Sequence, residues 1–106
     1  MAKFNPVMTK LEKSIQAGLR DGGREVLKRA RELAPKDSGE LHKGGAVAVD
    51  DLTMQVAFRG DYAVIQHENL DFEHPNGQAK FLETSTEQVD IGPILAARNR
   101  KDLGGA

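Results

Sequence analysis

The chain has 106 residues, a length that fits a single domain spanning residues 1–106. Its 15 Lys and Arg residues and 16 Asp and Glu residues leave a formal net charge of -1, which argues against a generally cationic nucleic-acid binder. Cysteine is absent, which excludes disulfides, thiolate metal sites and a cysteine nucleophile. No apolar run approaches the ~18 residues of a membrane span, so no membrane partner is expected.

Residues 9–34 are predicted to form one long amphipathic helix. Apolar residues recur there at intervals of three and four, the period of one helical face: Leu11, Ile15, Leu19, Val26, Ala30 and Leu33, with Gly22 on the same line. Pro35 ends the helix, because the residue before a proline is pushed out of the helical region. Such a helix measures about 39 Å, more than the roughly 33 Å diameter expected of a domain this size. One end is therefore expected to lean on another molecule.

Two glycines, Gly22 and Gly23, lie in the middle of this helix, where each costs about 1 kcal/mol relative to alanine. They are either a weak point or bend, or a place of close approach to another backbone or subunit, since glycine removes the side chain that would block it. On the second interpretation they belong to a subunit interface.

Nearly opposite the apolar face, a basic stripe runs along the same helix, consisting of Lys13, Arg20, Arg24, Lys28 and Arg31. The stripe is either a solvated face with distributed counter-charges or a surface that meets DNA or an acidic partner. With four Phe, one Tyr and no Trp, a stacking platform for reading bases is not expected.

Residues 42–59 are predicted to form a β-hairpin. The segment 53–59 alternates, with Met54, Val56 and Phe58 on one face, and Asp50 with Asp51 suits the turn. Because a lone hairpin is marginal in water, it must pack on the long helix, and neighbouring subunits could supply further strands.

The C-terminal half is expected to begin with a short helical turn at 61–68, capped by Gly60 and Asp61, in which Tyr62 and Ile65 or Gln66 stand at helical spacing. A polar loop at 69–78 and a helix at 79–101 that is broken near 92–93 are expected to follow. Leu70 and Phe72, in the loop, either fold back onto their own domain or insert into an adjacent subunit. The inward side chains of the last helix are expected to be Phe81, Leu82, Ser85 and Val89.

Pro93 interrupts this helix or, alternatively, opens a short final helix over 94–101. Ile94 and Leu95 then become candidates for docking on a partner. Residues 102–106 are expected to be a flexible tail. The expected fold class is α+β: a long N-terminal amphipathic helix packed on a small antiparallel sheet, with a C-terminal helix.

Residues that could carry chemistry are few. His67, Glu68 and His74 could in principle offer metal ligands, but the His-Glu-x-x-His spacing of metallohydrolases is missing. No Ser-His-Asp order, P-loop or dinucleotide fingerprint is present. No catalytic residue, metal or cofactor is predicted.

Three short motifs follow the long helix in a characteristic order. They are a turn with Pro35, Asp37, Ser38, Gly39 and Leu41, a segment with Tyr62, His67 and Glu68, and a segment with Phe81 and Leu82. Over roughly residues 9–90, this order resembles the tail-completion and head–tail joining proteins of long-tailed bacteriophages, also labelled minor capsid or minor tail proteins. The break at Gly92 and Pro93 departs from the continuous helix of that family.

The resemblance implies a structural virion protein without catalytic activity, located at the head–tail interface. It implies a homo-oligomeric ring, with sixfold symmetry favoured, whose partners are other phage neck, connector or tail proteins. Genomic DNA passing through the lumen could then make non-specific contact with the basic stripe.

Two other functions are left open by the residues. The basic stripe could serve a small DNA-binding or regulatory module, whose duplex affinity would fall steeply with salt. The residues His67, Glu68 and His74 could serve a small metal-dependent hydrolase, which metal analysis of the purified protein would test.

Overall fold

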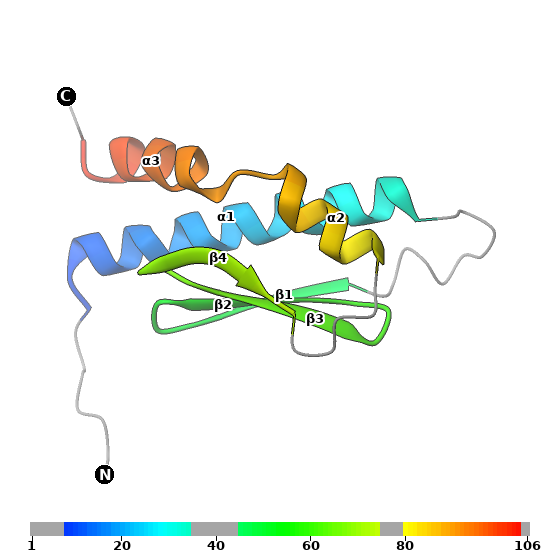
Figure 1. Ribbon diagram of the computed structural model, residues 1–106. Coiled ribbons are helices and arrows are strands. Elements are labelled where there is room, and N and C mark those ends of the chain that lie inside the picture. Colours follow the sequence, from blue (N-terminus) through cyan, green and yellow to red (C-terminus); the bar gives the residue numbers. More distant parts are fainter. Residues whose placement is uncertain (1–7, 35–44, 75–79, 105–106) are drawn as a thin grey trace, which may run out of the picture.

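The computed structural model describes residues 8–34, 45–74 and 80–104 (Figure 1). In chain order the elements are α1 (Lys10–Leu33), β1 (Gly45–Asp50), β2 (Thr53–Phe58), β3 (Asp61–Gln66), β4 (Asn69–Glu73), α2 (Lys80–Gln88) and α3 (Ile91–Asp102). The predicted α+β class is confirmed, with a long N-terminal helix, an antiparallel sheet and helical C-terminal elements. The predicted turn that contains Pro35, Asp37, Ser38, Gly39 and Leu41 lies outside the described residues.

The helix α1 begins and ends where local chemistry directs it to. The Thr9 side chain accepts a hydrogen bond from the Glu12 N–H (3.0 Å), and the Glu12 carboxylate accepts one from the Thr9 N–H (2.9 Å), which forms a capping box. At the other end, Ala34 adopts an extended conformation (φ -77°, ψ 149°), as expected of a residue before proline. The 24 helical residues fall within the predicted range 9–34.

The sheet is a four-stranded antiparallel meander in the order β1-β2-β3-β4. Its β1–β2 hairpin was predicted, and Val47 lies opposite Val56 in it. The predicted helical turn at 61–68 is wrong, because Asp61–Gln66 forms β3. The predicted loop at 69–78 contains a further strand, Asn69–Glu73.

Backbone conformation explains why the segment after residue 60 forms a strand rather than a helix. Arg59 (φ 55°) and Gly60 (φ 90°) adopt left-handed conformations, which form the tight turn between β2 and β3. Side chains of β3 then alternate, with Ala63 and Ile65 buried in the core and Tyr62 and Val64 on the opposite face. The three-residue spacing of Tyr62 and Ile65 had suggested a helical turn.

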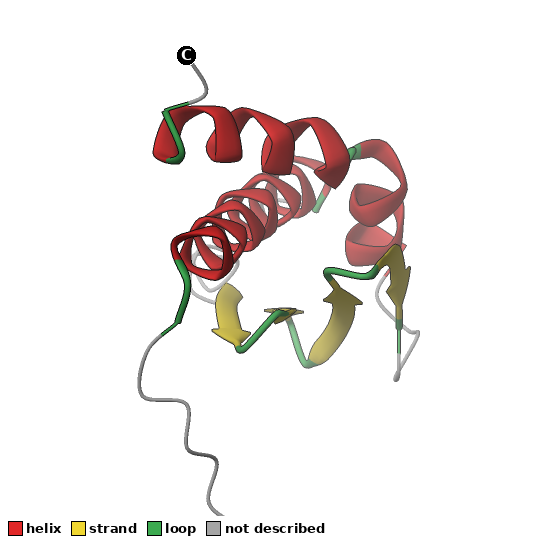
Figure 2. Ribbon diagram, turned by 90° about the vertical axis from the view of Figure 1, so that its left-hand side faces the viewer, coloured by secondary structure: helices red, strands yellow, loops and turns green. Residues whose placement is uncertain are grey.

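All three helices lie on one side of the sheet (Figures 1 and 2). α1 packs on β1 and β2, α2 packs beside α1 and reaches β3, and α3 runs along α1. The central core residues, all almost fully buried, are Leu19, Val26, Met54, Val56, Phe58, Ile65 and Leu82. The long helix therefore leans on α2 and α3 of its own chain, whereas the sequence led us to expect support from another molecule.

The break in the C-terminal helix precedes the predicted position. α2 ends at Gln88, and Asp90 caps α3 by accepting a hydrogen bond from the Gly92 N–H (3.2 Å). Pro93 lies in the first turn of α3, where the missing N–H has no helical partner to lose. The alternative of a separate final helix is thus the observed one, with an earlier start, and α3 extends to Asp102 in the predicted tail.

Candidate interaction surfaces

The glycines predicted at a subunit interface are used inside the chain. A Cβ on Gly22 would lie 2.5 Å from Cδ1 of Ile91, and one on Gly23 would lie 2.6 Å from Cγ1 of Val47. They let α3 and β1 approach opposite sides of α1, so the close approach is real but intramolecular. Leu95 is likewise buried in the core rather than free for a partner, whereas Ile94 is half-buried.

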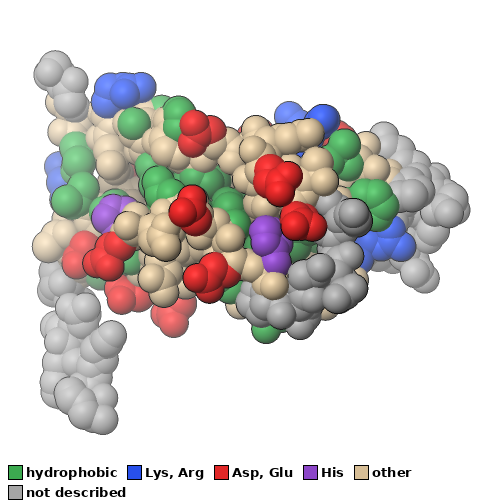
Figure 3. Space-filling model, in the orientation of Figure 1, with side chains coloured by type: hydrophobic (Ala, Val, Ile, Leu, Met, Phe, Trp, Pro, Cys, Tyr) green, Lys and Arg blue, Asp and Glu red, His purple; other side chains and the backbone are tan. Residues whose placement is uncertain are grey.

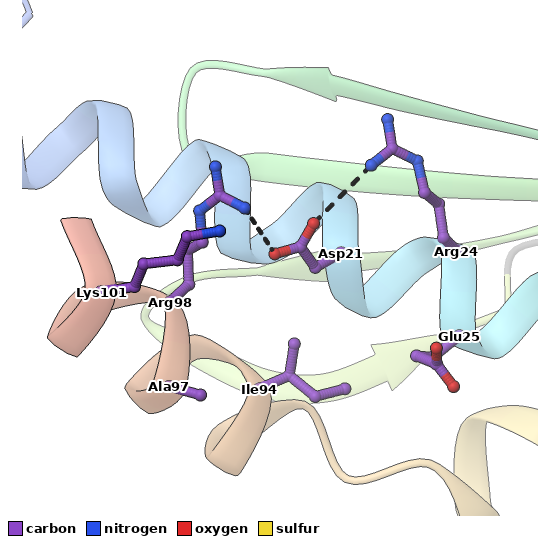
Figure 4. A pocket seen from close by; sticks show the side chains of 7 residues that line it. All are labelled: Asp21, Arg24, Glu25, Ile94, Ala97, Arg98 and Lys101. Atoms are coloured by element: carbon purple, nitrogen blue, oxygen red, sulfur yellow. Dashed lines mark hydrogen bonds and ion pairs between the residues drawn. The ribbon is translucent and has the colours of Figure 1, made fainter.

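A polar network joins α1 to α3 along one side of the helix pair. The Arg98 guanidinium bonds to Asp102 (2.8 Å). It also bonds to Asp21 (3.2 Å), and Arg24 lies 3.7 Å from the same Asp21 carboxylate (Figure 4). The hydrogen bond from Arg98 lowers the pKa of Asp102, and the same hydrogen bond to the Asp102 carboxylate raises the pKa of Arg98. Asp21 therefore neutralises part of the predicted basic stripe at its centre.

The five residues of the basic stripe all lie on α1, but they are not equally available. Lys13, Arg24 and Lys28 are exposed, whereas Arg20 and Arg31 are half-buried. The Nε of Arg31 is buried and without a hydrogen-bond partner. The stripe is thus an exposed basic strip only at Lys13, Arg24 and Lys28, the second of which faces Asp21.

Charge is divided between two parts of the fold. The helices α1 and α3 contain ten Lys and Arg residues against five Asp and Glu residues, whereas the segment 45–90, with the sheet and α2, contains two against nine. Figure 3 shows the face with β4 and α2, on which acidic side chains gather while basic ones lie toward the margins. The net charge of the whole chain is near zero because a basic helix pair and an acidic sheet balance one another. The net charge alone therefore did not reveal this division.

A groove of about 610 Å³ opens between β4 and the α2–α3 connection, and we call it the β4–α2 groove. Its apolar lining residues are Leu70, Phe72, Val89 and Ile91, and its acidic lining residues are Asp71, Glu83, Glu87 and Asp90. Those four carboxylates form no ion pair with any described side chain. Of the predicted pair, Phe72 packs partly on its own core, and Leu70 stays 37% exposed at the groove.

A second surface lies at the end where α1 begins and α3 finishes. Leu11 is 49% exposed and Leu103 38% exposed, although Leu11 had been predicted to face the core. Each lies about one turn beyond the contact of Ser14 with Asn99 (2.7 Å), so both mark the same end of the antiparallel helix pair (Figure 1). The exposed residues of this helix-end patch are Lys10, Leu11, Lys13, Arg100, Lys101 and Leu103.

The face of the sheet away from the helices is covered by no described element (Figure 2). An antiparallel sheet with a solvated face normally places polar residues on that face. Here the outward positions of β1 to β3 hold polar residues (Asp50, Thr53, Gln55 and Gln66) beside small, apolar or aromatic ones (Ala46, Ala48, Ala57, Tyr62 and Val64). These three strands contain no Lys or Arg, the residues that commonly protect sheet surfaces and edges from association.

The histidines considered as metal ligands are not brought together. His67 lies in the turn before β4 and His74 directly after it, so roughly 17 Å of strand separates them. His74 contacts the Thr86 hydroxyl (3.1 Å), Glu68 is exposed, and the Nδ1 of His67 is buried without a partner. The described part of the chain holds no cluster of three or more side chains arranged for a metal ion.

The remaining motif residues have structural positions. Leu82 is buried in the core, Phe81 packs partly against it, and Tyr62 lies on the outer face of the sheet opposite Ala57. Among the helices that the structure describes, none has the length and apolar character required to cross a bilayer. No protein-family model matches the chain, and neither a curated protein nor a solved structure resembles it significantly.

Proposed function

We propose that this chain is a structural virion protein of a long-tailed bacteriophage. In this proposal it is a tail-completion or neck subunit, whose copies form a ring, sixfold by the resemblance, at the head–tail interface and join the tail to the capsid. The order of the sequence motifs suggests the family, and the surfaces of the fold support an assembling subunit rather than an enzyme.

The observation that carries the proposal is the outer face of the sheet. The side chains of Ala46, Ala48 and Ala57 are small, so the surface of another subunit can approach this face closely, and Val64 adds an apolar contact beside them. These apolar positions are favourable to bury, and β1 to β3 contain no Lys or Arg that would have to be desolvated. Asp50 and Gln55, on the same face, need polar partners in the contact. This face fits a protein whose sheet is covered by another subunit in its working state.

The division of charge supports a ring in particular. A closed ring is built from heterologous contacts, in which each subunit presents two different and complementary surfaces. The basic helix pair and the acidic sheet lie on one chain, so head-to-tail contact between copies places unlike charges together.

The test is the assembly state of the purified full-length chain, measured by sedimentation velocity and by electron microscopy. We expect a discrete ring-shaped oligomer that grows with protein concentration, and particles that carry the same ring at the neck. A chain that stays monomeric at millimolar concentration, with no ring in particles, contradicts the proposal.

A DNA-binding or regulatory module is the second candidate, favoured by the excess of Lys and Arg on α1 and α3. This function predicts duplex binding at low salt that weakens steeply as salt is raised, because phosphate contacts release counterions. A flat titration with duplex DNA at low salt dismisses this alternative.

A further inference from the structure

We infer that the helix-end patch of one copy docks in the β4–α2 groove of the next copy. This inference rests on the proposed ring and identifies two surfaces that meet in its repeating contact, in addition to the outer face of the sheet. The groove lies between β4, α2 and the start of α3, whereas the patch lies at the start of α1 and the end of α3, so they are separate surfaces of one chain, as a heterologous contact requires.

The exposed leucines select these two surfaces. In the described part of the chain, the exposed large apolar side chains are Leu11, Leu70 and Leu103. Two of them belong to the helix-end patch and the third borders the groove, whose floor also contains Phe72. Apolar surface that is exposed in each free copy becomes buried when the two surfaces meet, which favours association.

Charge selects the same pair. The leucines of the patch are flanked by Lys10, Lys13, Arg100 and Lys101, all exposed, and the groove is bordered by four carboxylates without described ionic partners. The acidic residues nearest in sequence to the patch already have local partners, since Glu12 closes the capping box and Asp102 binds Arg98. Contact between the two surfaces therefore brings together charges of opposite sign.

The middle of the basic stripe is a poorer match for the groove. Arg24 already faces Asp21, and the exposed positions of that part of α1 offer no large apolar side chain. The groove, in contrast, has Glu83 and Glu87 at a spacing of four residues on α2, a like-charge pair that is unfavourable in an isolated helix. A basic partner turns this pair into a favourable one.

The experiment uses two double variants of the full-length chain with opposite changes. The groove variant carries Glu83→Lys and Glu87→Lys, and the patch variant carries Arg100→Glu and Lys101→Glu. Glu68→Lys, in the exposed turn at the other end of β4, serves as the control for reversing a charge away from both surfaces. We expect the dissociation constant of the oligomer, measured by sedimentation equilibrium, to be at least tenfold higher for each double variant alone than for the unmodified chain. The control is expected to assemble normally.

Mixing makes the test specific. In an equimolar mixture, the acidic patch of one variant meets the basic groove of the other, and the two unmodified surfaces also meet, so assembly is expected to return. Leu70→Ser changes no charge but removes an apolar contact at the groove, so it is also expected to weaken assembly. Circular dichroism melting of every variant separates loss of contact from loss of fold.

The outcomes distinguish the inference from the proposed function. If both double variants form rings as readily as the unmodified chain, the inference that these two surfaces dock is overturned, while the proposal of a ring still stands. Variants that dissociate alone but do not reassemble when mixed also overturn it, because the charges then do not face one another. An unmodified chain without any oligomer overturns the proposed function together with the inference.

Discussion

Gly18 of α1 lies directly beneath Leu95 of α3: a Cβ built on Gly18 would stand 2.6 Å from Cδ2 of Leu95 and 3.3 Å from its Cα. The second of these atoms belongs to the backbone, so the contact sets how closely the two helices approach. Together with Gly22 under Ile91, it lets α3 bury its apolar side against α1. This packing leaves the charged residues of both helices on their outer sides.

Replacing Gly18 by alanine is expected to destabilise the fold, although alanine favours a helix by about 1 kcal/mol. The added methyl group has to displace Leu95 in a packed core, and such overpacking costs about 1–3 kcal/mol. The free energy of unfolding from urea titration measures the net change.

Gly22→Ala is the comparison on the same helix, because its Cβ would meet only side-chain atoms of Ile91, the nearest of them 2.5 Å away, and no backbone atom. We expect this variant to lose less stability than Gly18→Ala, because the end of a side chain shifts more readily than a backbone atom. If Gly18→Ala is as stable as the unmodified chain or more stable, α1 and α3 do not pack as described.

Acid is expected to weaken the link between α3 and its neighbours through Asp102. The hydrogen bond from Arg98 lowers the pKa of Asp102 below its ordinary value of 3.8. The stabilisation is therefore complete above the unfolded pKa and is lost as the pH falls through the lower folded pKa. In melts at successive pH values, the unmodified chain should exceed Asp102→Asn in melting temperature at pH near 6, and this difference should shrink toward pH 3. A constant difference contradicts the assignment.

Metal removal is expected to leave the protein unchanged. His67 and His74 lie at opposite ends of β4, and His74 already contacts the Thr86 hydroxyl. Metal analysis of the purified chain should therefore find no stoichiometric ion, and chelator should not alter the melting temperature. A bound ion that is lost on His67→Ala and also on His74→Ala would restore the hydrolase hypothesis.

The sequence predicted those elements whose signals are local. The 3.6-residue period located α1, strict alternation located β2, and the inward positions of α2 included the buried Leu82 and Ser85. The strand β3 was missed because Tyr62 and Ile65 stand three residues apart, a spacing that also fits a helical turn, and the neighbouring glycine resembled a cap. The positive φ of Arg59 and Gly60 makes the two-residue turn that joins β2 to β3.

The surfaces were harder to predict because they combine distant parts of the chain. The basic residues of α1 were found from their spacing, but the helix-end patch unites residues near 11 with residues near 101. The groove similarly joins β4 to α2 and α3. For Gly22 and Gly23, close approach was one of two interpretations, and the element that approaches them, α3 or β1 rather than another subunit, depends on packing that no local pattern encodes.

Placing a charge on the outer face of the sheet is expected to block assembly without unfolding the subunit. Ala48 is exposed on β1, so Ala48→Lys removes no core contact and its effect on the free energy of unfolding should stay within about 0.5 kcal/mol. The new ammonium group lies near Asp50 on the same face, and burying it against another subunit still requires its desolvation, which is unfavourable.

The measurement is sedimentation velocity of Ala48→Lys beside Glu68→Lys, which introduces the same residue in an exposed turn. We expect monomers for the first variant and the oligomer of the unmodified chain for the second, with equal melting temperatures. If Ala48→Lys assembles as well as the control, the outer face is a solvated face in the working protein. The proposal of a subunit whose sheet is covered by its neighbour then has to be abandoned, because the small apolar residues of β1 to β3 would have no partner to bury them.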